Sequence, residues 1–278
     1  MEITFEGTSN FVDLPSGKVH YNKAGAGHPV ILLHGSGPGA TGWSNFAANI
    51  SVLADHFAVY AIDMPGWGES SPVTFEKRNH VQTLVEFMDA LGIDKAAVVG
   101  NSMGGATTIR FAAQHPDRMS HLITMGPGSV GVKLFGFGDG PSEGLKILQK
   151  GYREPSMETM LELVDIMSFD SGAEREPRAR LRVDSLLAHP EHIKNFIDGI
   201  GKPAPGNFVS EEELAKFPMP ALLMHGRDDR VVHYENTLKL VALIPNSRAL
   251  LFNKCGHWAQ VEHADEFNRV VIDFVKNA

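Results

Sequence analysis

Six short and almost continuously apolar runs recur along this chain, and they limit its fold more than any other feature. Runs of this kind are typical of strands that are covered on both faces, as in a parallel sheet. Several of the segments between them have the apolar periodicity of helices, and this alternation predicts an α/β fold with a doubly wound, mostly parallel sheet. The strand runs cover residues 29–35, 57–66, 96–102, 121–128, 221–229 and 248–257, and the helical patterns cover 81–92, 106–116, 235–245 and 264–278.

The alternation stops between about residues 130 and 215. A glycine-rich stretch, GVKLFGFGDGPSEG, is followed there by helical patterns without any run of the strand type. We interpret this part as a helical cap inserted into the sheet domain. The expected organisation is a first part of the core at 1–130, a cap at 131–212 and a second part of the core at 213–278.

Charge and composition limit the kinds of partner and the cellular location that we expect for this chain. The 278 residues carry a formal net charge of −8, which argues against nucleic acid as a partner because phosphate binding requires a basic face. The start, MEITFEGTSNF, has neither the basic region nor the apolar region of a secretory signal, and no run approaches the roughly 18 apolar residues of a membrane span. A single cysteine, Cys255, cannot form an internal disulfide. We therefore expect a cytoplasmic protein without a membrane partner.

Residues 100–104, Gly-Asn-Ser-Met-Gly, match the pattern G-x-S-x-G between a predicted strand and a predicted helix. A nucleophile elbow requires this context. Small residues allow the tight turn, and a serine at the helix N-terminus lies where free N–H groups stabilise developing negative charge. A glycine-rich turn with an incidental serine is the alternative. The strand, turn and helix together favour Ser102 as a nucleophile.

A nucleophilic serine requires a base, and the base requires an orienting acid. Thirteen histidines are present, so position must choose among them. Functional groups collect beyond the carboxyl ends of parallel strands, where His257 follows the last apolar run and Asp228 and Asp229 follow the run before it. The order Ser, Asp, His is that of the α/β-hydrolases, and either aspartate could accept the imidazole N–H. His34 also ends a run but precedes Ser102, so we interpret it as a structural histidine in a glycine loop.

An oxyanion hole for this nucleophile requires two backbone N–H groups. One belongs to the residue after the serine, Met103, and the other to the loop after an early strand. In HGSGPGA that second donor is expected at Ser36, because the flanking glycines let the backbone approach a ligand closely.

Four stretches, HGSGPGATGWSNF, GNSMGGAT, GRDDRVV and CGHWAQVEHADEFN, together resemble the meta-cleavage product hydrolases. These are α/β-hydrolases that cut a carbon–carbon bond in the bacterial degradation of aromatic compounds. The resemblance covers nearly the whole chain and implies an α/β-hydrolase fold with an inserted helical cap. It implies as substrate a 2-hydroxy-6-oxo-hexa-2,4-dienoate, hydrolysed at C5–C6 to a 2-hydroxypenta-2,4-dienoate and a carboxylic acid. It further implies a reaction without a cofactor, in a homo-oligomer.

The resemblance assigns the chemical roles residue by residue. Ser102, Asp229 and His257 fall on the triad positions. Ser36 and Met103 fall on the oxyanion positions.

The same resemblance implies residues that contact the substrate. Asn45, Asn101 and Trp258 match polar and aromatic pocket positions, and RVDSLLAHPEHIKNF matches the segment whose arginine binds the substrate carboxylate, which is here Arg182. From the residues alone, Arg182 would equally fit the basic face of a solvated helix. Met167, a further pocket position, stands where biphenyl-type members carry phenylalanine, so a phenyl acyl group is not implied. The alternative for Met167 is a place in the cap core.

Other functions remain open at this point. A carboxylesterase or lactonase on the same scaffold would need the triad but not Arg182. A non-catalytic ligand receptor of the same fold is less consistent with an intact triad. Haloalkane dehalogenases and epoxide hydrolases use an aspartate where this chain has Ser102. No metal site is expected, since His189 and His192 lack a nearby set of further ligands.

Overall fold

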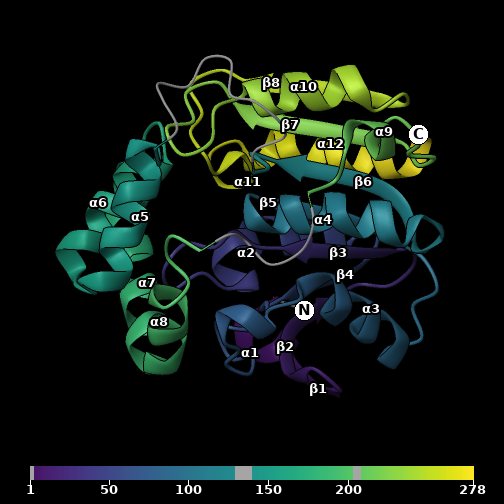
Figure 1. The fold of residues 1–278 in the computed structure, drawn as a ribbon. Coiled ribbons are helices and arrows are strands. Elements are labelled where there is room, and N and C mark those ends of the chain that lie inside the picture. The colour runs from purple at the N-terminus through teal and green to yellow at the C-terminus, as the bar shows by residue number, and fades with distance from the viewer. Residues whose placement is uncertain (1–2, 129–139, 203–207) are drawn as a thin grey trace.

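An eight-stranded sheet runs through the middle of the fold, with helices on both of its faces and a separate group of helices at one end (Figure 1). The structure, a computed structural model, describes residues 3–128, 140–202 and 208–278. The strands are β1 (Ser9–Leu14), β2 (Gly17–Ala24), β3 (Pro29–Leu33), β4 (Ala58–Ile62), β5 (Ala96–Asn101), β6 (Met119–Met125), β7 (Ala221–Gly226) and β8 (Ser247–Phe252). The α-helices are α1 (Phe5–Thr8), α2 (Gly42–Ala54), α3 (His80–Ala90), α4 (Met103–Gln114), α5 (Glu143–Arg153), α6 (Met157–Met167), α7 (Arg175–Ala188), α8 (Pro190–Ile197), α9 (Glu211–Leu214), α10 (Glu235–Leu243), α11 (Ala259–Glu262) and α12 (Ala264–Asn277), and the short 3₁₀ helices are η1 (Phe75–Lys77), η2 (Pro116–Arg118) and η3 (Gly172–Glu174).

The strand order is β1-β2-β4-β3-β5-β6-β7-β8. From β4 to β8 every pairing is parallel, whereas β2 pairs antiparallel with both β1 and β4. Each of the six predicted runs overlaps a strand. The α/β fold with a mostly parallel sheet, which their alternation with helices predicted, is confirmed. The parallel strands place their carboxyl ends at one edge of the sheet, which is where ligands bind in such folds.

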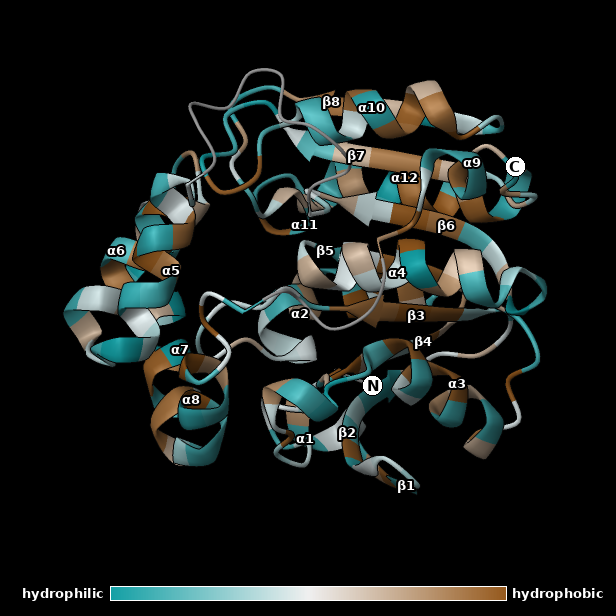
Figure 2. Cartoon of the chain, in the orientation of Figure 1, coloured by the Kyte–Doolittle hydropathy of each residue, from teal (hydrophilic) through white to brown (hydrophobic). Residues whose placement is uncertain are grey.

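The central strands are buried along their whole length. Every residue of β5 and β7 is buried, because helices cover both faces of the sheet there. Figure 2 shows β3 and β7 as almost wholly hydrophobic, while helices such as α4 and α10 carry both hydrophobic and hydrophilic residues. The expectation of full cover is wrong for β8. It is the last strand of the sheet, and most of its side chains are partly or fully exposed.

Four elements at the beginning of the chain were not predicted, namely α1, β1, β2 and α2. Strands β1 and β2 form a hairpin whose first strand is mostly exposed, so its sequence contains no apolar run. Helix α2 follows the glycine loop directly, and it begins with a capping box in which Thr41 and Ser44 exchange side-chain and backbone hydrogen bonds. The glycines and polar residues at its start concealed its helical pattern.

Two hydrophobic layers hold the helices on the sheet. Helices α3, α4 and α10 pack on one face and α2 and α12 on the other. Helices α5, α6 and α7 form a third hydrophobic cluster, which Val231 and Trp258 of the core loops join. Among the described residues, no helix is long and apolar enough to cross a membrane.

The inserted helices α5–α8 stand beside the sheet domain, next to the carboxyl ends of the parallel strands (Figure 1). They follow β6 and precede β7 in sequence, as an inserted cap requires. The predicted boundary after residue 130, with most of its glycine-rich stretch, lies outside the described residues. The predicted boundary after residue 212 falls inside α9.

Candidate active site

Ser102 occupies the single position between β5 and α4. Its φ is +53° and its ψ is −112°, a strained conformation for a residue other than glycine. Its backbone N–H donates to the carbonyl of Met125 at 2.9 Å. A Cβ on Gly104 would overlap the backbone carbonyl of Leu33, so only glycine permits the close approach of helix and strand. This geometry is that of a nucleophile elbow.

The loops after β7 and β8 bring Asp229 and His257 together. Nδ1 of His257 lies 2.6 Å from Oδ2 of Asp229, and the two residues are only 3% and 7% exposed. Asp228, the other candidate acid, accepts a hydrogen bond from the backbone N–H of Cys255 at 3.3 Å. Geometry thus separates two aspartates that the sequence pattern alone left equivalent.

The carboxylate of Asp229 is held at both oxygens. Oδ1 accepts from the backbone N–H groups of Val231 at 2.8 Å and Val232 at 2.9 Å, and Oδ2 lies 3.1 Å from Nε2 of His225 in addition to His257. Burial on its own raises the pKa of Asp229, but the charge of His257 and the hydrogen bonds from both histidines outweigh it, and the pKa ends well below its usual range. Asp229 is therefore ionised at neutral pH.

Sequence reasoning missed His225. It lies inside the apolar run of β7, where it is fully buried. The available signal was a polar side chain at the carboxyl end of a buried strand, four residues before Asp229.

Asn101 joins the nucleophile strand to the histidine loop. Its Nδ2 donates to the backbone carbonyls of Met125 at 3.2 Å and His257 at 3.1 Å. Its Oδ1 is buried without a hydrogen-bond partner in the described part of the chain, and the hydroxyl of Ser102 likewise makes no hydrogen bond to another described residue. The predicted contact of Asn101 with substrate stays a prediction, for which Oδ1 is the available acceptor.

The two predicted oxyanion residues, Ser36 and Met103, both line a cavity of about 760 Å³. Its size is that of a small-molecule site. Helix α5 holds the loop of Ser36 in place, since the hydroxyl of Tyr152 on this helix donates to the Ser36 carbonyl at 3.0 Å. Tyr152 in turn accepts from Nε1 of Trp67 at 2.8 Å. His34, at the start of this loop, is buried and bonds only within the core, as its structural interpretation requires.

Arg182 of α7 points from the inserted helices onto the glycine loop. It is 4% exposed, its Nη1 donates to the carbonyl of Pro38 at 3.0 Å, and its guanidinium lies 4.5 Å from the ring centroid of Trp258. Burial lowers its pKa to about 10, so it stays charged at neutral pH. Asn45, which is 2% exposed, lines a small cavity together with Arg182 and Trp258. Three of the predicted substrate residues are thus brought together, and the solvated-helix alternative for Arg182 is wrong.

The end of α6 is hydrogen-bonded to the loop that carries His257. The carbonyl of Met167 accepts from the His257 N–H at 2.7 Å. Oε1 of Glu262 accepts from the Gly256 N–H at 2.8 Å, and its Oε2 accepts from the Phe169 N–H at 2.7 Å. The Met167 side chain is 2% exposed and packs in the third hydrophobic cluster, among the inserted helices, which agrees with the core position that was the alternative to a pocket role.

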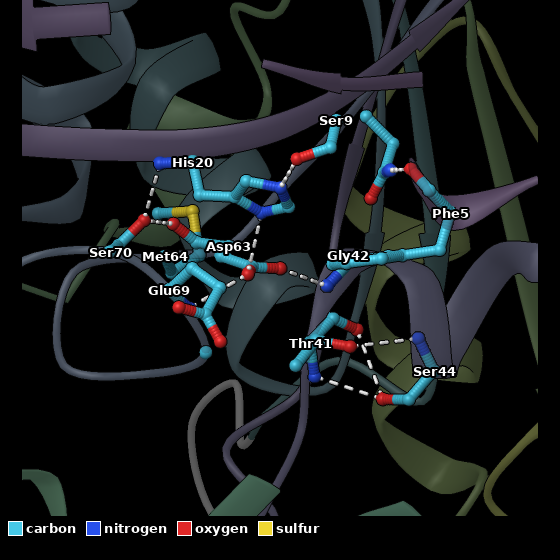
Figure 3. Close-up of polar contacts among 12 residues, drawn as sticks. Phe5, Ser9, His20, Thr41, Gly42, Ser44, Asp63, Met64, Glu69 and Ser70 are labelled. Atoms are coloured by element: carbon cyan, nitrogen blue, oxygen red, sulfur yellow. Dashed lines mark hydrogen bonds and ion pairs between the residues drawn. The ribbon is translucent and has the colours of Figure 1, made fainter. Parts of the chain in front are cut away.

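A second Ser–His–Asp array lies at the start of the sheet, as Figure 3 shows. Nε2 of His20 is 2.9 Å from the Ser9 hydroxyl and its Nδ1 is 2.8 Å from Oδ2 of Asp63. The other Asp63 oxygen accepts from the Gly42 N–H at 2.7 Å, at the first turn of α2. None of these residues lines the 760 Å³ cavity. The array anchors the end of the glycine loop.

Within the residues that the structure describes, no three His, Cys, Asp or Glu side chains come together as a metal-ion site. His189 and His192 stack on each other, and their ring nitrogens contact Glu69 and the carbonyl of Gly68.

Comparison with known proteins agrees with this geometry. Residues 28–264 match the model of the alpha/beta hydrolase fold family. The chain is 41% identical, over 99% of its length and 95% of the relative's, to 2-hydroxy-6-oxo-6-phenylhexa-2,4-dienoate hydrolase of Burkholderia cepacia. It is 40% identical, over 99% of its length and 98% of the relative's, to 2-hydroxy-6-oxononadienedioate/2-hydroxy-6-oxononatrienedioate hydrolase of Cupriavidus pinatubonensis. A solved meta-cleavage product hydrolase from Pseudomonas fluorescens IP01 superposes with a TM-score of 0.85 at 33% identity, over 96% of this chain and 97% of that one.

Proposed function

Since this chain belongs to the meta-cleavage product hydrolases of the alpha/beta hydrolase family, we propose that Ser102, Asp229 and His257 are its catalytic triad. The enzyme hydrolyses a carbon–carbon bond of meta-cleavage products in the degradation of aromatic compounds. The proposed substrate is a 2-hydroxy-6-oxo-hexa-2,4-dienoate, cleaved between C5 and C6.

The buried charge of Arg182 is the observation that favours this substrate over an ordinary ester. Within the described residues, no ion pair includes Arg182, although its side chain is almost completely buried. A buried guanidinium without a carboxylate partner is costly unless a ligand supplies one. The C1 carboxylate of the dienoate meets that need, and a planar guanidinium can bind it through two hydrogen bonds. A simple ester has no such group.

The proposed reaction begins with a proton shift in the substrate. The 2-hydroxyl loses its proton and C5 gains one, which gives a 2,6-diketone with a double bond between C3 and C4. In this proposal His257 moves the proton, and Arg182 stabilises the negative charge near C1 and C2. The shift is required because direct cleavage would leave an unstabilised carbanion.

Cleavage then proceeds through Ser102. Its oxygen attacks C6 while its proton passes to His257, and the N–H groups of Ser36 and Met103 stabilise the oxyanion. When C5–C6 breaks, its electron pair moves through C3=C4 onto the C2 oxygen, which takes a proton to give the 2-hydroxypenta-2,4-dienoate. Water activated by His257 attacks the acyl-serine and releases the carboxylic acid.

The proposal includes the inserted helices as a cap over this site, a homo-oligomeric assembly and a cytoplasmic location. The hydrogen bonds from Tyr152 to the Ser36 carbonyl and from His257 to the Met167 carbonyl support the cap, since they join it to both sides of the site. The buried free thiol of Cys255 supports a reducing compartment.

The test uses the absorbance of the yellow dienolate. Purified enzyme should bleach 2-hydroxy-6-oxo-6-phenylhexa-2,4-dienoate and release the pentadienoate. Ser102→Ala should lose at least about 10³-fold in turnover and still bind the dienolate. Full turnover by Ser102→Ala would remove the triad assignment.

Arg182 separates the proposed activity from esterase activity. Arg182→Met should lower kcat/KM for the dienolate about 100-fold, because the carboxylate loses a charged bidentate partner, and should change hydrolysis of a small aryl ester less than about 3-fold. The matched control is Arg180→Met, two residues earlier on α7, where the side chain is exposed. Equal losses on both substrates, or an enzyme that hydrolyses only esters, would favour a carboxylesterase.

A further inference from the structure

The 760 Å³ cavity begins at the oxyanion residues and runs along one face of α4. Met103, Thr107 and Arg110 of that helix line it at intervals of four and three residues, which places them in one row. Arg182, Asn45 and Trp258 are not part of its lining and gather at a different small cavity. The following inference rests on the proposed function. A substrate with C1 at Arg182 and C6 at the oxyanion residues extends its acyl substituent into the larger cavity.

This acyl cavity carries two arginines on a lining that mixes apolar and polar residues; Lys77 and Glu76 also line it, and Glu76 is paired with Lys202. Arg78, next to the start of α3, lies over the ring of Trp67 at 4.7 Å, and its Nε is buried without a hydrogen-bond partner among the described residues. No ion pair of the described residues includes it. Arg110 enters from α4, and burial lowers the pKa of both guanidinium groups. Such a lining suits a chain of methylenes that ends in an anion.

The charges of Arg78 and Arg110 both act on the side chain of His80. It lines the same cavity, and its Nε2 donates to the carbonyl of Pro65 at 3.3 Å. Burial, then the charge of Arg78 and more weakly that of Arg110, lower the pKa of His80 to about 3. Both guanidinium groups therefore lie within electrostatic range of one buried side chain in the cavity wall.

We propose that the substrate's acyl substituent ends in a carboxylate, and that Arg78 and Arg110 bind this second carboxylate at the far end of the acyl cavity. Along α4, Arg110 lies about 10 Å beyond Met103, and helical side chains tilt toward the helix N-terminus, so its guanidinium reaches back toward the oxyanion. In a nine-carbon dienedioate the second carboxylate is three carbons from the C6 carbonyl, about 4 Å away. Hydrolysis of that substrate yields 2-hydroxypenta-2,4-dienoate and a four-carbon dicarboxylate.

A phenyl group is a poorer occupant of the same space. It would exclude water from the partly buried guanidinium of Arg78 without supplying an acceptor, and the charge would remain unpaired. Phe75 and Phe196 line the cavity, and their rings suit the methylenes between the two polar ends.

The experiment compares two substrates that differ only in this carboxylate, 2-hydroxy-6-oxonona-2,4-dienedioate and 2-hydroxy-6-oxonona-2,4-dienoate. The wild-type kcat/KM should be at least 10-fold higher for the dioate. In Arg78→Met and in Arg110→Met this preference should fall toward 1, while kcat/KM for the monoacid changes less than 3-fold. The matched control is Arg248→Met, on the edge strand β8 outside the cavity lining, which should keep the preference.

A second measurement needs no variant. Succinate should inhibit wild-type turnover at a concentration at least 10-fold lower than butyrate, because only succinate has a carboxylate to place at the two arginines. A wild-type enzyme that prefers the monoacid or the phenyl substrate, together with equal inhibition by succinate and butyrate, would overturn the carboxylate subsite. Failure to cleave any of these dienoates would instead refute the proposed function.

Discussion

Two histidines contact the same carboxylate oxygen of Asp229, Oδ2. Nδ1 of His257 lies 2.6 Å from it and Nε2 of His225 lies 3.1 Å from it. Nε2 of His225 also lies 2.8 Å from the carbonyl of Val232. A carboxylate and a carbonyl can only accept, so Nε2 carries a proton and donates, while Nδ1 lies 2.8 Å from the hydroxyl of Thr237. His225 is thus a positioning residue that stabilises the ionised form of Asp229.

Replacing His225 should weaken the triad without touching substrate. In His225→Leu, Asp229 loses one hydrogen bond to its charged form, and its pKa rises. We expect kcat to fall about 10-fold with KM nearly unchanged, and the lower pH limit of the kcat profile to move upward. Thr237→Val is the matched control, since it removes the bond at Nδ1 and leaves the Nε2 donor in place. A kcat for His225→Leu within 2-fold of that of Thr237→Val would contradict this role.

Glu262 should support both the histidine loop and the end of α6. Its two oxygens accept from the N–H groups of Gly256 and Phe169, and burial raises its pKa. Glu262→Gln turns an N–H toward another N–H, so we expect the free energy of unfolding to fall by about 1–3 kcal/mol and kcat to fall with it. Urea unfolding and steady-state kinetics measure the two effects. Glu266→Gln, at a partly exposed position of α12 with a weak ion pair, should change neither, and an equally small effect of both substitutions would count against Glu262.

Gly104 should tolerate no side chain. A Cβ there would overlap the backbone carbonyl of Leu33, which cannot withdraw without disturbing β3. We expect Gly104→Ala to destabilise the protein by at least about 3 kcal/mol or to prevent its folding. At Gly128 the nearest atom to an added Cβ is the Ala106 Cβ at 3.9 Å, so Gly128→Ala should unfold at nearly the wild-type temperature. Similar melting temperatures for the two variants would refute the packing argument.

His80 should make stability depend on pH in one direction. Its pKa is about 3 in the folded protein and about 6.5 in an unfolded chain, so the unfolded state binds more protons between these values. The contribution of neutral His80 is complete above about pH 6.5 and is lost as pH falls, by up to about 1.4 kcal/mol per pH unit. The difference in unfolding free energy between wild type and His80→Gln should shrink by about 2 kcal/mol from pH 7 to pH 5. A difference that does not vary with pH in urea titrations would show that His80 titrates normally.

Local patterns in the sequence predicted much of the sheet. Strands covered on both faces need apolar side chains at every position, so β3, β5 and β7 were visible as runs. The edge strand β1 has only one buried residue, Leu14, so no apolar run marked it.

The candidate active site also has a part that the sequence predicted and a part that only the structure shows. The sequence by itself determined the elbow at Ser102, the order Ser, Asp, His and the position of Met103, because a tight turn between strand and helix needs small residues within five positions. The resemblance assigned Asp229 rather than Asp228, and the tertiary structure showed that Asp229 contacts His257. Only the tertiary structure added His225 to the acid and placed Arg78 and Arg110 along one cavity. These relationships join loops and helices whose distances follow from the packing of the sheet and the inserted helices, and no local pattern of residues contains that information.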